Sequence, residues 1–174
     1  MASVGHVFVG MAAARFERER RRVTWQPFST AVVWSGLSLL PDADVIGFRL
    51  GVKYADEWGH RGATHSIAFA AGVALVVWLV ARLMRLPATR TAVLAFAVVV
   101  SHGLLDTLTD GGLGCALLWP FSHERFFAPW TPIPVAPIGR AFLSREGLRV
   151  ALTESLLLSP FLVYALWRRR RPQT

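Results

Sequence analysis

The chain has 174 residues, of which 53% are hydrophobic and 17% are charged, and its formal net charge is +8. This length predicts one domain, residues 1–174. Soluble domains usually carry about a quarter of charged residues, so the deficit favours a polytopic membrane protein over a soluble one. The basic residues stand beside apolar segments, as juxtamembrane arginines do, and therefore do not indicate a nucleic-acid partner. The single cysteine, Cys115, excludes an intrachain disulfide and a cysteine-rich zinc site.

The N-terminal part contains two apolar segments separated by arginines. The first, Ser3–Phe16, ends in the cluster Arg15–Arg22. A cleavable signal peptide has its positive charge before the apolar stretch, so this order predicts an uncleaved segment whose N-terminus lies outside. The second segment, Thr24–Leu40, has Trp25 near its basic end as an interfacial anchor and stops at Pro41.

The middle of the chain predicts a loop followed by a helical hairpin. Residues 45–63 mix glycine with charged residues, which is typical of a loop with short helical turns. Ser66–Leu83 is the clearest spanning helix. Its polar exit, Arg82–Arg90, leads into a returning apolar segment, Thr91–Leu108.

The C-terminal part predicts a surface cap and one more helix. Asp110–Arg140 is rich in glycine, proline and aromatic residues, so it cannot form a helix interior. Gly147–Trp167 predicts the last spanning helix, and Arg168–Arg171 follow it. The expected fold class is therefore all-α: a polytopic membrane bundle of about four to five helices with a proline- and aromatic-rich outer loop.

The distribution of arginine predicts the orientation of the segments. If the three arginine clusters lie on the cytoplasmic side, five spans alternate without contradiction. The histidines and aspartates of four separate segments then gather at the outer face. These residues are His6, Asp42, Asp44, His60, His65, His102 and Asp106. Such convergence of distant segments on one membrane boundary predicts a functional site.

The stretch from Ser101 to Asp106 contains the strongest metal-binding signal. His102 and Asp106 are four residues apart, so in a helix they lie on one face. An imidazole and a carboxylate in this arrangement can bind one divalent ion, since zinc and manganese accept mixed nitrogen and oxygen ligands. The alternative is a hydrogen-bonded pair at a helix end.

The segment from His60 to Ser66 has two imidazoles on either side of a glycine. Thr64 or Ser66 could cap the following helix. Arg61 could hold a phosphate or carboxylate group. The alternative interpretation is a polar helix cap with exposed histidines.

The remaining candidates depend more on position than on pattern. Asp42 and Asp44 offer two carboxylates after Pro41, which suits a hard divalent ion or, alternatively, a solvated helix end. His6 has only its position in its favour, and a buried structural histidine is the alternative. Glu154 lies inside the last helix, where a carboxylate is costly and usually functional or paired. We expect it to face the site or a polar cavity, with Arg149 as a competing partner.

Five motifs in order resemble the bacterial inner-membrane metal-dependent hydrolases of the YdjM-like type. They are Gly5-His6, Leu39–Asp44, His60–Ser66, Ser101–Asp106 and Leu117–Ser122. That family is distantly similar to zinc-dependent phospholipase C, an all-helical enzyme with histidine and aspartate ligands. The resemblance implies His65, His102 and Asp106 as the first metal ligands. Asp42, Asp44, His60 and His6 come next.

The expected activity is hydrolysis of an ester at the outer membrane face. The substrate would be a phosphoester of a lipid or of a lipid-linked compound, and the ion zinc, with manganese or magnesium as alternatives. A metal lowers the pKa of bound water, and one of Asp42, Asp44 or Asp106 would orient or deprotonate that water. Arg61, together with Arg125, would hold the anionic group. The alternatives are a structural metal site or a metal transporter, although a transporter is expected to place its ligands near the bilayer midplane.

Overall fold

The computed structural model describes residues 3–21 and 27–167, which form helices and irregular segments. Trp25, Arg22 and Arg168–Arg171 lie outside the described residues, so the predictions made for them are not addressed. The helices are α1 (Ser3–Arg21), α2 (Pro27–Leu39), the 3₁₀ helix η1 (Leu40–Leu50), η2 (Ala63–His65), α3 (Ile67–Leu83), α4 (Ala88–Asp106), η3 (Gly139–Leu143), α5 (Arg145–Leu157) and α6 (Ser159–Leu166). Within the described ranges, β-structure is limited to two isolated bridges, Thr109–Ile133 and Cys115–Phe126.

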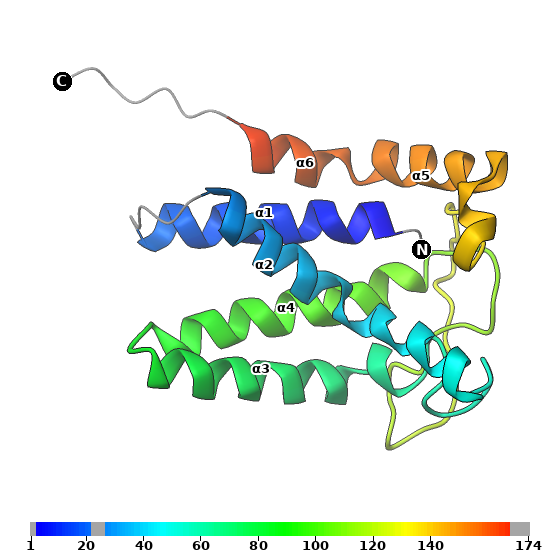
Figure 1. Cartoon of the computed structure of the whole chain (residues 1–174), viewed down its shortest axis with the longest axis horizontal. Coiled ribbons are helices and arrows are strands. Elements are labelled where there is room, and N and C mark those ends of the chain that lie inside the picture. Colours follow the sequence, from blue (N-terminus) through cyan, green and yellow to red (C-terminus); the bar gives the residue numbers. More distant parts are fainter. Residues whose placement is uncertain (1–2, 22–26, 168–174) are drawn as a thin grey trace.

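The long helices run back and forth along one axis (Figure 1). The start of α1, the end of α4, both short helices η1 and η2 and the cap at residues 110–140 lie at one end of the bundle. The end of α1 and the turn between α3 and α4 lie at the opposite end. We call these the cap end and the basic end. The alternation predicted from the arginines is therefore present in the fold.

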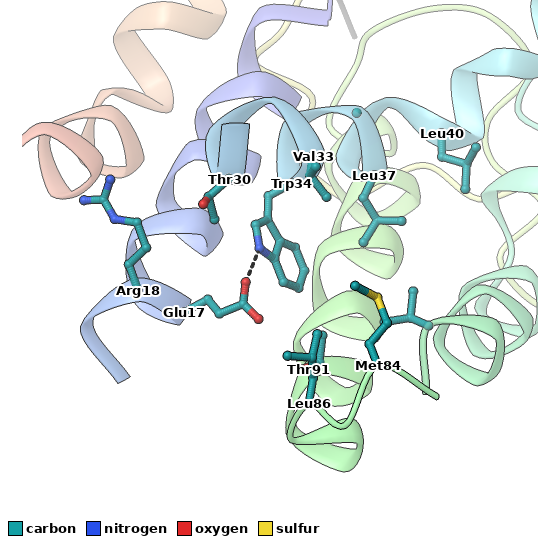
Figure 2. A pocket seen from close by; sticks show the side chains of 12 residues that line it. Glu17, Arg18, Thr30, Val33, Trp34, Leu37, Leu40, Met84, Leu86 and Thr91 are labelled. Carbon is teal, nitrogen blue, oxygen red and sulfur yellow. Dashed lines mark hydrogen bonds between the residues drawn. The ribbon is translucent and has the colours of Figure 1, made fainter. Parts of the chain in front are cut away.

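Close packing of small residues holds α1 against α2. A side chain at Gly10 would overlap the backbone of Ser35, so the two helices touch there through their main chains. Small residues allow helices to approach in this way in membrane proteins. Nearby, Trp34 is buried and donates its indole N–H to Glu17 Oε2 at 2.6 Å, which links the two helices beside a groove (Figure 2).

The predicted end of the first helix is wrong. The helix continues past Phe16 to Arg21. Arg15 is buried and forms an ion pair with Glu19 at 2.9 Å, one helical turn later, and its guanidinium also donates to the carbonyl of Tyr164 in α6. These contacts satisfy the charge inside the bundle, so the arginine cluster extends the helix instead of ending it.

The predicted stop of the second segment at Pro41 is right for the α-helix but not for the helical chain as a whole. The α-helix α2 ends at Leu39, but the chain continues as the 3₁₀ helix η1 through Leu50. Pro41 stands in the first turn of η1, where a missing N–H costs nothing. Gly51, with a φ of +85°, then ends the helix in the left-handed conformation. The loop predicted to begin at Val45 therefore begins at Gly51.

The predicted last span is bent. Two helices, α5 and α6, replace the single segment Gly147–Trp167 and meet at an angle of 62°. Pro160 lies in the first turn of α6, and it lacks the N–H that would continue the hydrogen bonding of α5.

The number of membrane spans is tested only in part. Phe28–Leu50 and Ala88–Asp106 are long and apolar enough to cross a membrane, and α5 with α6 makes a third if the bent pair is one span. The helix α3 is apolar but has 17 residues, and Leu75, Val76 and Leu79 on its outer side are exposed. The all-α membrane bundle is thus confirmed, whereas five spans remain a prediction.

Candidate metal centre

His102 and Asp106 occupy the last turn of α4, and both are fully buried. The Nδ1 atom of His102 lies 2.7 Å from the carbonyl oxygen of Ser38. A carbonyl only accepts hydrogen bonds, so Nδ1 carries a proton and Nε2 is the ring nitrogen left to face an ion. This Nε2 is 3.3 Å from Asp42 Oδ1. The backbone of α2 therefore orients a histidine of α4 that is a candidate ligand.

His65 is presented by the short helix η2, just before α3. Ser66 caps α3 as predicted, because its hydroxyl accepts a hydrogen bond from Phe69 N at 3.0 Å. Thr64, the other capping candidate, instead donates to Asp44 Oδ2 at 2.8 Å. The Nδ1 atom of His65 faces the same Asp44 oxygen at 3.4 Å. A histidine held by a carboxylate through one ring nitrogen is the usual arrangement behind a metal ligand.

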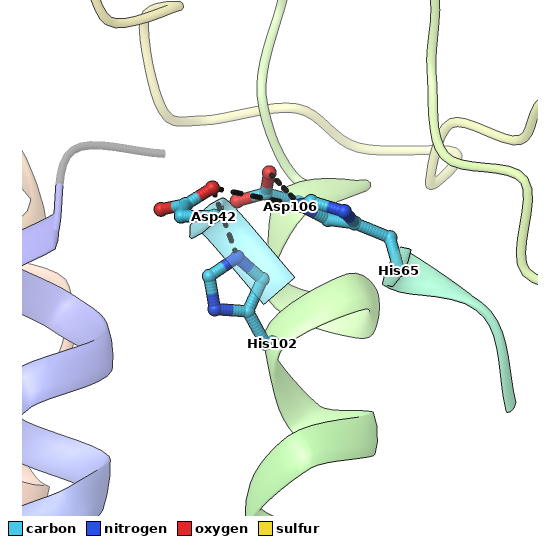
Figure 3. Close-up of side chains that lie close together, drawn as sticks. All are labelled: Asp42, His65, His102 and Asp106. Atoms are coloured by element: carbon cyan, nitrogen blue, oxygen red, sulfur yellow. Dashed lines mark ion pairs between the residues drawn. The ribbon is translucent and has the colours of Figure 1, made fainter. Parts of the chain in front are cut away.

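Four side chains from three segments meet at one point (Figure 3). They are Asp42 of η1, His65 of η2, and His102 and Asp106 of α4. Each offers one ligand atom, and these atoms all lie within 4.8 Å of one another. His65 Nε2 is 3.6 Å from both Asp42 Oδ1 and Asp106 Oδ2.

The four side chains fit a divalent cation. The Nε2 atoms of His65 and His102 are buried and have no hydrogen-bond partner within the part of the chain that the structure describes. Buried polar atoms without partners are costly. Two imidazole nitrogens and two carboxylates form a donor set that zinc accepts. His65 and Asp42 therefore complete, with His102 and Asp106, a group of four side chains that could hold one ion.

The charge around His65 is also suited to a cation. Burial alone would lower the pKa of His65, but the carboxylates of Asp42 and Asp44 raise this pKa to about 9. The negative field that favours a proton on His65 would equally favour a divalent ion beside it.

Asp44 and His60 form a second group next to the first. Asp44, His60 and His65 each offer a ligand atom, again within 4.8 Å of one another. His60 Nδ1 is hydrogen-bonded to Asp44 Oδ1 at 2.8 Å, and the backbone N–H of Arg61 donates to Asp44 Oδ2 at 3.2 Å. With both oxygens engaged and its side chain buried, Asp44 is better placed to orient histidines than to deprotonate water.

Arg61 is held inside the protein by both its side chain and its backbone. Its Nε atom lies 3.0 Å from Asp106 Oδ2, and its guanidinium donates to Thr109 Oγ1 and to the carbonyl of Gly111. Its backbone has a φ of +62°, a conformation that costs a residue with a side chain about 1 kcal/mol. Arg61 therefore holds Asp106 in place. Fewer of its N–H groups are left to bind a substrate anion than the sequence suggested.

His6 is one step removed from the four convergent side chains. Its Nε2 lies 3.3 Å from Asp106 Oδ1, and its ring stacks on that of His102 with centroids 3.6 Å apart. The structure therefore brings His6 to the predicted place, beside the ligand atoms but outside both groups that could hold an ion.

Glu154, the last of the candidates, and His123 of the cap have partners outside the four convergent side chains. His123 is exposed and forms an ion pair with Glu57. Glu154 is buried and accepts a hydrogen bond from Gly5 N at 3.1 Å, while Arg149 faces Glu146 instead. Neither the contact of Glu154 with Gly5 nor that of Glu146 with Arg149 involves Asp42, His65, His102 or Asp106, the four side chains that we call the metal cluster.

Arg125, the other residue expected to hold an anionic group, contacts the backbone of residues 54–60. Its guanidinium donates to the carbonyls of His60, Tyr54 and Asp56. In addition, the carbonyl of Arg61 accepts from Ala116 N at 2.9 Å. The cap thus fastens the segment that carries His60 and His65.

A cavity of about 330 Å³ reaches the cluster from the cap. Asp42, His60 and Arg61 line its polar side, and Val135, Ile138 and Phe142 belong to its apolar side. Of the four convergent side chains, Asp42 alone keeps appreciable exposure, at 20%. This cavity is not predictable from sequence patterns, because most of its apolar wall comes from residues 135–142, an irregular stretch that leads into η3.

Comparisons with known proteins agree on one family. The sequence model of the YdjM inner membrane protein family matches residues 1–171. The chain is also 43% identical over 140 residues to the inner membrane protein YbcI of Escherichia coli (strain K12), which covers 78% of this chain and 81% of that protein. No solved structure shows a significant match.

Proposed function

The chain belongs to the YdjM inner membrane protein family, and we propose that it is a membrane-bound metal-dependent hydrolase of an ester, with a phosphoester of a lipid or lipid-linked compound as substrate. The observation that carries the proposal is the meeting of two buried imidazole nitrogens, on His65 and His102, with the carboxylates of Asp42 and Asp106; neither nitrogen has a hydrogen bond to the described residues. Zinc is the expected ion, and manganese or magnesium are the alternatives.

The ion would be held by Asp42, His65, His102 and Asp106. When bound, it would supply Lewis acidity and lower the pKa of water. The carbonyl of Ser38 fixes the ring of His102, Asp44 fixes that of His65, and Arg61 fixes the carboxylate of Asp106. Partners of this kind orient ligands and tune their basicity.

We assign proton transfer to His60, with Asp44 as its orienting partner. The imidazole of His60 lines the cavity and is hydrogen-bonded to Asp44, which fixes its position. A histidine paired with a carboxylate is a common general acid or base. This assignment moves the acid–base role predicted for Asp44 to its neighbour, and keeps Asp44 necessary for it.

The cavity supports an amphiphilic substrate. Its polar side is formed by the residues next to the cluster, and its apolar side by the segment that leads into η3. An anionic ester group would meet Asp42 only through the bound cation, because the carboxylate alone repels it. The apolar side would accept the adjoining hydrocarbon.

We further propose that the site faces outward. Support comes from the arginines Arg18, Arg20, Arg82, Arg85 and Arg90, which are at the basic end, opposite the cluster. Positive residues mark the cytoplasmic side. A reporter fused after Thr174 should then be cytoplasmic, and one inserted in the cap between Asp110 and Arg140 should be external. Reports from the same side would contradict this orientation.

The decisive experiment measures metal content and hydrolysis on one preparation. The purified protein, reconstituted in bilayers, is analysed for bound metals and assayed against lipid phosphoesters, carboxylic esters and amides. We expect phosphoester hydrolysis that stops on chelation and returns with zinc. His60→Gln should keep the metal and lose two to four orders of magnitude in rate, the usual contribution of a positioned acid or base. A metal-loaded protein that hydrolyses none of the panel would overturn the enzyme proposal.

The second candidate function is a structural metal site. It is favoured by one observation, that the four ligands come from η1, η2 and α4 and would be tied together by an ion. In that case chelation should lower the melting temperature without any activity to lose. Transport is disfavoured, because the ligands lie at one end of the bundle instead of near its middle.

A further inference from the structure

A second cavity lies away from the metal cluster, towards the basic end of the bundle. It is a groove of about 450 Å³ between α1, α2 and the turn from α3 to α4 (Figure 2). Val33, Trp34, Leu37 and Leu40 of the α2–η1 segment line it along its length, and Met84 and Leu86 form the opposite wall. Its volume is within the range of ligand-binding clefts.

The groove is apolar along most of its length and polar at one end. Glu17, Arg18 and Thr30 lie at that end, whereas the side towards Leu40 is hydrocarbon (Figure 2). From Thr30 to Leu40 the helical segment advances by roughly 15 Å. The groove therefore has the form of a channel for an extended chain with a polar group at one end.

The charge around the polar end is strongly positive. Arg20 and Arg90 line a small adjoining pocket with Phe16 and Thr91, and Arg82 and Arg85 are exposed in the neighbouring turn. The two glutamates of this end are engaged, since Glu17 accepts from Trp34 Nε1 and Glu19 pairs with Arg15. Arginine is the side chain best suited to phosphate, through paired N–H donors.

From these observations we propose that the groove binds an anionic phospholipid, with one acyl chain along α2 and the phosphate beside Arg18, where Arg20 and Arg90 of the adjoining pocket add to the positive field. Basic pockets between membrane helices recognise lipid head groups in this way. Val33 and Met84 are more than half exposed, so the groove is open to the hydrocarbon from which a lipid would enter. The site is independent of the proposed hydrolase activity, because none of its residues belongs to the metal cluster.

Retained lipid on the purified full chain tests the proposal. The protein in detergent is titrated with phosphatidylglycerol or with phosphatidylcholine of the same acyl chains, and bound lipid is counted by native mass spectrometry. We expect phosphatidylglycerol to be retained at about tenfold lower concentration, since each arginine near the head group contributes to binding an anionic lipid. Equal retention of the two lipids would overturn the anionic preference and with it the proposal.

Two pairs of variants locate the lipid. Arg18→Gln with Arg90→Gln should remove the preference for phosphatidylglycerol, while Arg140→Gln with Arg145→Gln, exposed at the cap end, should keep it. Gly36→Leu should fill the groove, because Gly36 lines it and an added Cβ there meets nothing within 4 Å. Gly72→Leu is the matched control, a helical glycine in equally open space outside the groove.

Two outcomes of these experiments would overturn the lipid site. Lipid retention that is unchanged in Gly36→Leu would place the lipid elsewhere and overturn the site. A protein that co-purifies on the groove and is not displaced by phosphatidylglycerol would do the same. Both glycine variants favour helix formation, so loss of lipid in Gly36→Leu alone cannot be assigned to unfolding.

Discussion

A methyl group on Gly103 would overlap the carbonyl oxygen of His65. The absence of a side chain at residue 103 is what lets α4 lie against η2, and this contact brings His65 beside His102, the residue before Gly103. The ring centroids of the two histidines are 4.8 Å apart. The glycine of the stretch from Ser101 to Asp106 therefore sets the distance between two candidate ligands.

Gly103→Ala should accordingly disturb the site from outside the ligand set. We expect a loss of about 1–3 kcal/mol in stability, as for other overpacked positions, and at least tenfold weaker metal binding. Melting temperature and metal titration measure the two effects. Gly72→Ala, where an added Cβ meets nothing within 4 Å, is the control and should retain full metal affinity. Unchanged metal affinity in Gly103→Ala would show that the contact with η2 does not position His65.

Removing a ligand should be distinguishable from removing an exposed histidine. His102→Ala should lower bound metal by an order of magnitude or more, because one of about four ligands is lost. His123→Ala should leave metal content nearly unchanged, since His123 is exposed and contacts only Glu57 among the ion pairs described. Metal analysis after dialysis gives the comparison. An equal loss from both variants would point to unfolding and not to a metal site.

Asp44→Asn tests the orienting role of this carboxylate. The amide keeps only one acceptor oxygen, so it cannot accept both from His60 Nδ1, which now faces Oδ1, and from the hydroxyl of Thr64, which now donates to Oδ2. We expect metal affinity to fall by about 10–100-fold, the usual effect of losing a partner of a metal-bound histidine, with the fold retained. Titration with zinc measures this. Full affinity in Asp44→Asn would separate Asp44 from the metal centre.

The helix cap at Ser66 should contribute measurably to stability. Its hydroxyl accepts from Phe69 N in partly buried surroundings and donates to the carbonyl of Ala63 in buried ones. Ser66→Ala should cost about 0.5–2 kcal/mol. Ser144→Ala removes the equivalent cap of α5, which is longer at 3.4 Å and exposed, and should cost less. Denaturant unfolding in detergent compares the two, and a larger effect for Ser144 would contradict the ranking.

Cys115 should resist alkylation as long as the protein is folded. Its side chain is fully buried, and burial raises the pKa of its thiol to about 12. The reactive thiolate is therefore scarce at neutral pH. Maleimide labelling followed by mass measurement should show modification only after denaturation. Rapid labelling of the native protein would mean that the cap opens at residue 115.

The convergence of the site could be predicted from sequence because membrane topology fixes depth. Once the arginines assign one end of each segment, the other end of each must lie at the opposite face, and that is where His6, Asp42, His65 and His102 stand. The pairing of His102 with Asp106 followed from helical spacing alone. Both inferences use only the order of residues and the geometry of a helix.

The roles within the cluster could not be predicted in the same way. The carbonyl of Ser38 orients His102, but a backbone group is present at every residue and leaves no pattern. Asp42 and Asp44 look alike in sequence. Only the path of η1 decides that Asp44 contacts His60, whereas Asp42 lies among the four convergent side chains and faces His102. The partners of these histidines lie 16 or more residues away in the chain, and tertiary packing decides which of them come into contact.

The order in which the four convergent side chains are synthesised has a consequence for biogenesis. Asp42 and His65 leave the ribosome well before His102, and Asp106 comes last, while chain growth proceeds at about 5–20 residues per second. A cation held by all four can thus be captured only after α4 has been made. The first two helices must enter the membrane and pack without it, so that ion retention would report a completed insertion of the first four helices and not of α1 and α2 alone.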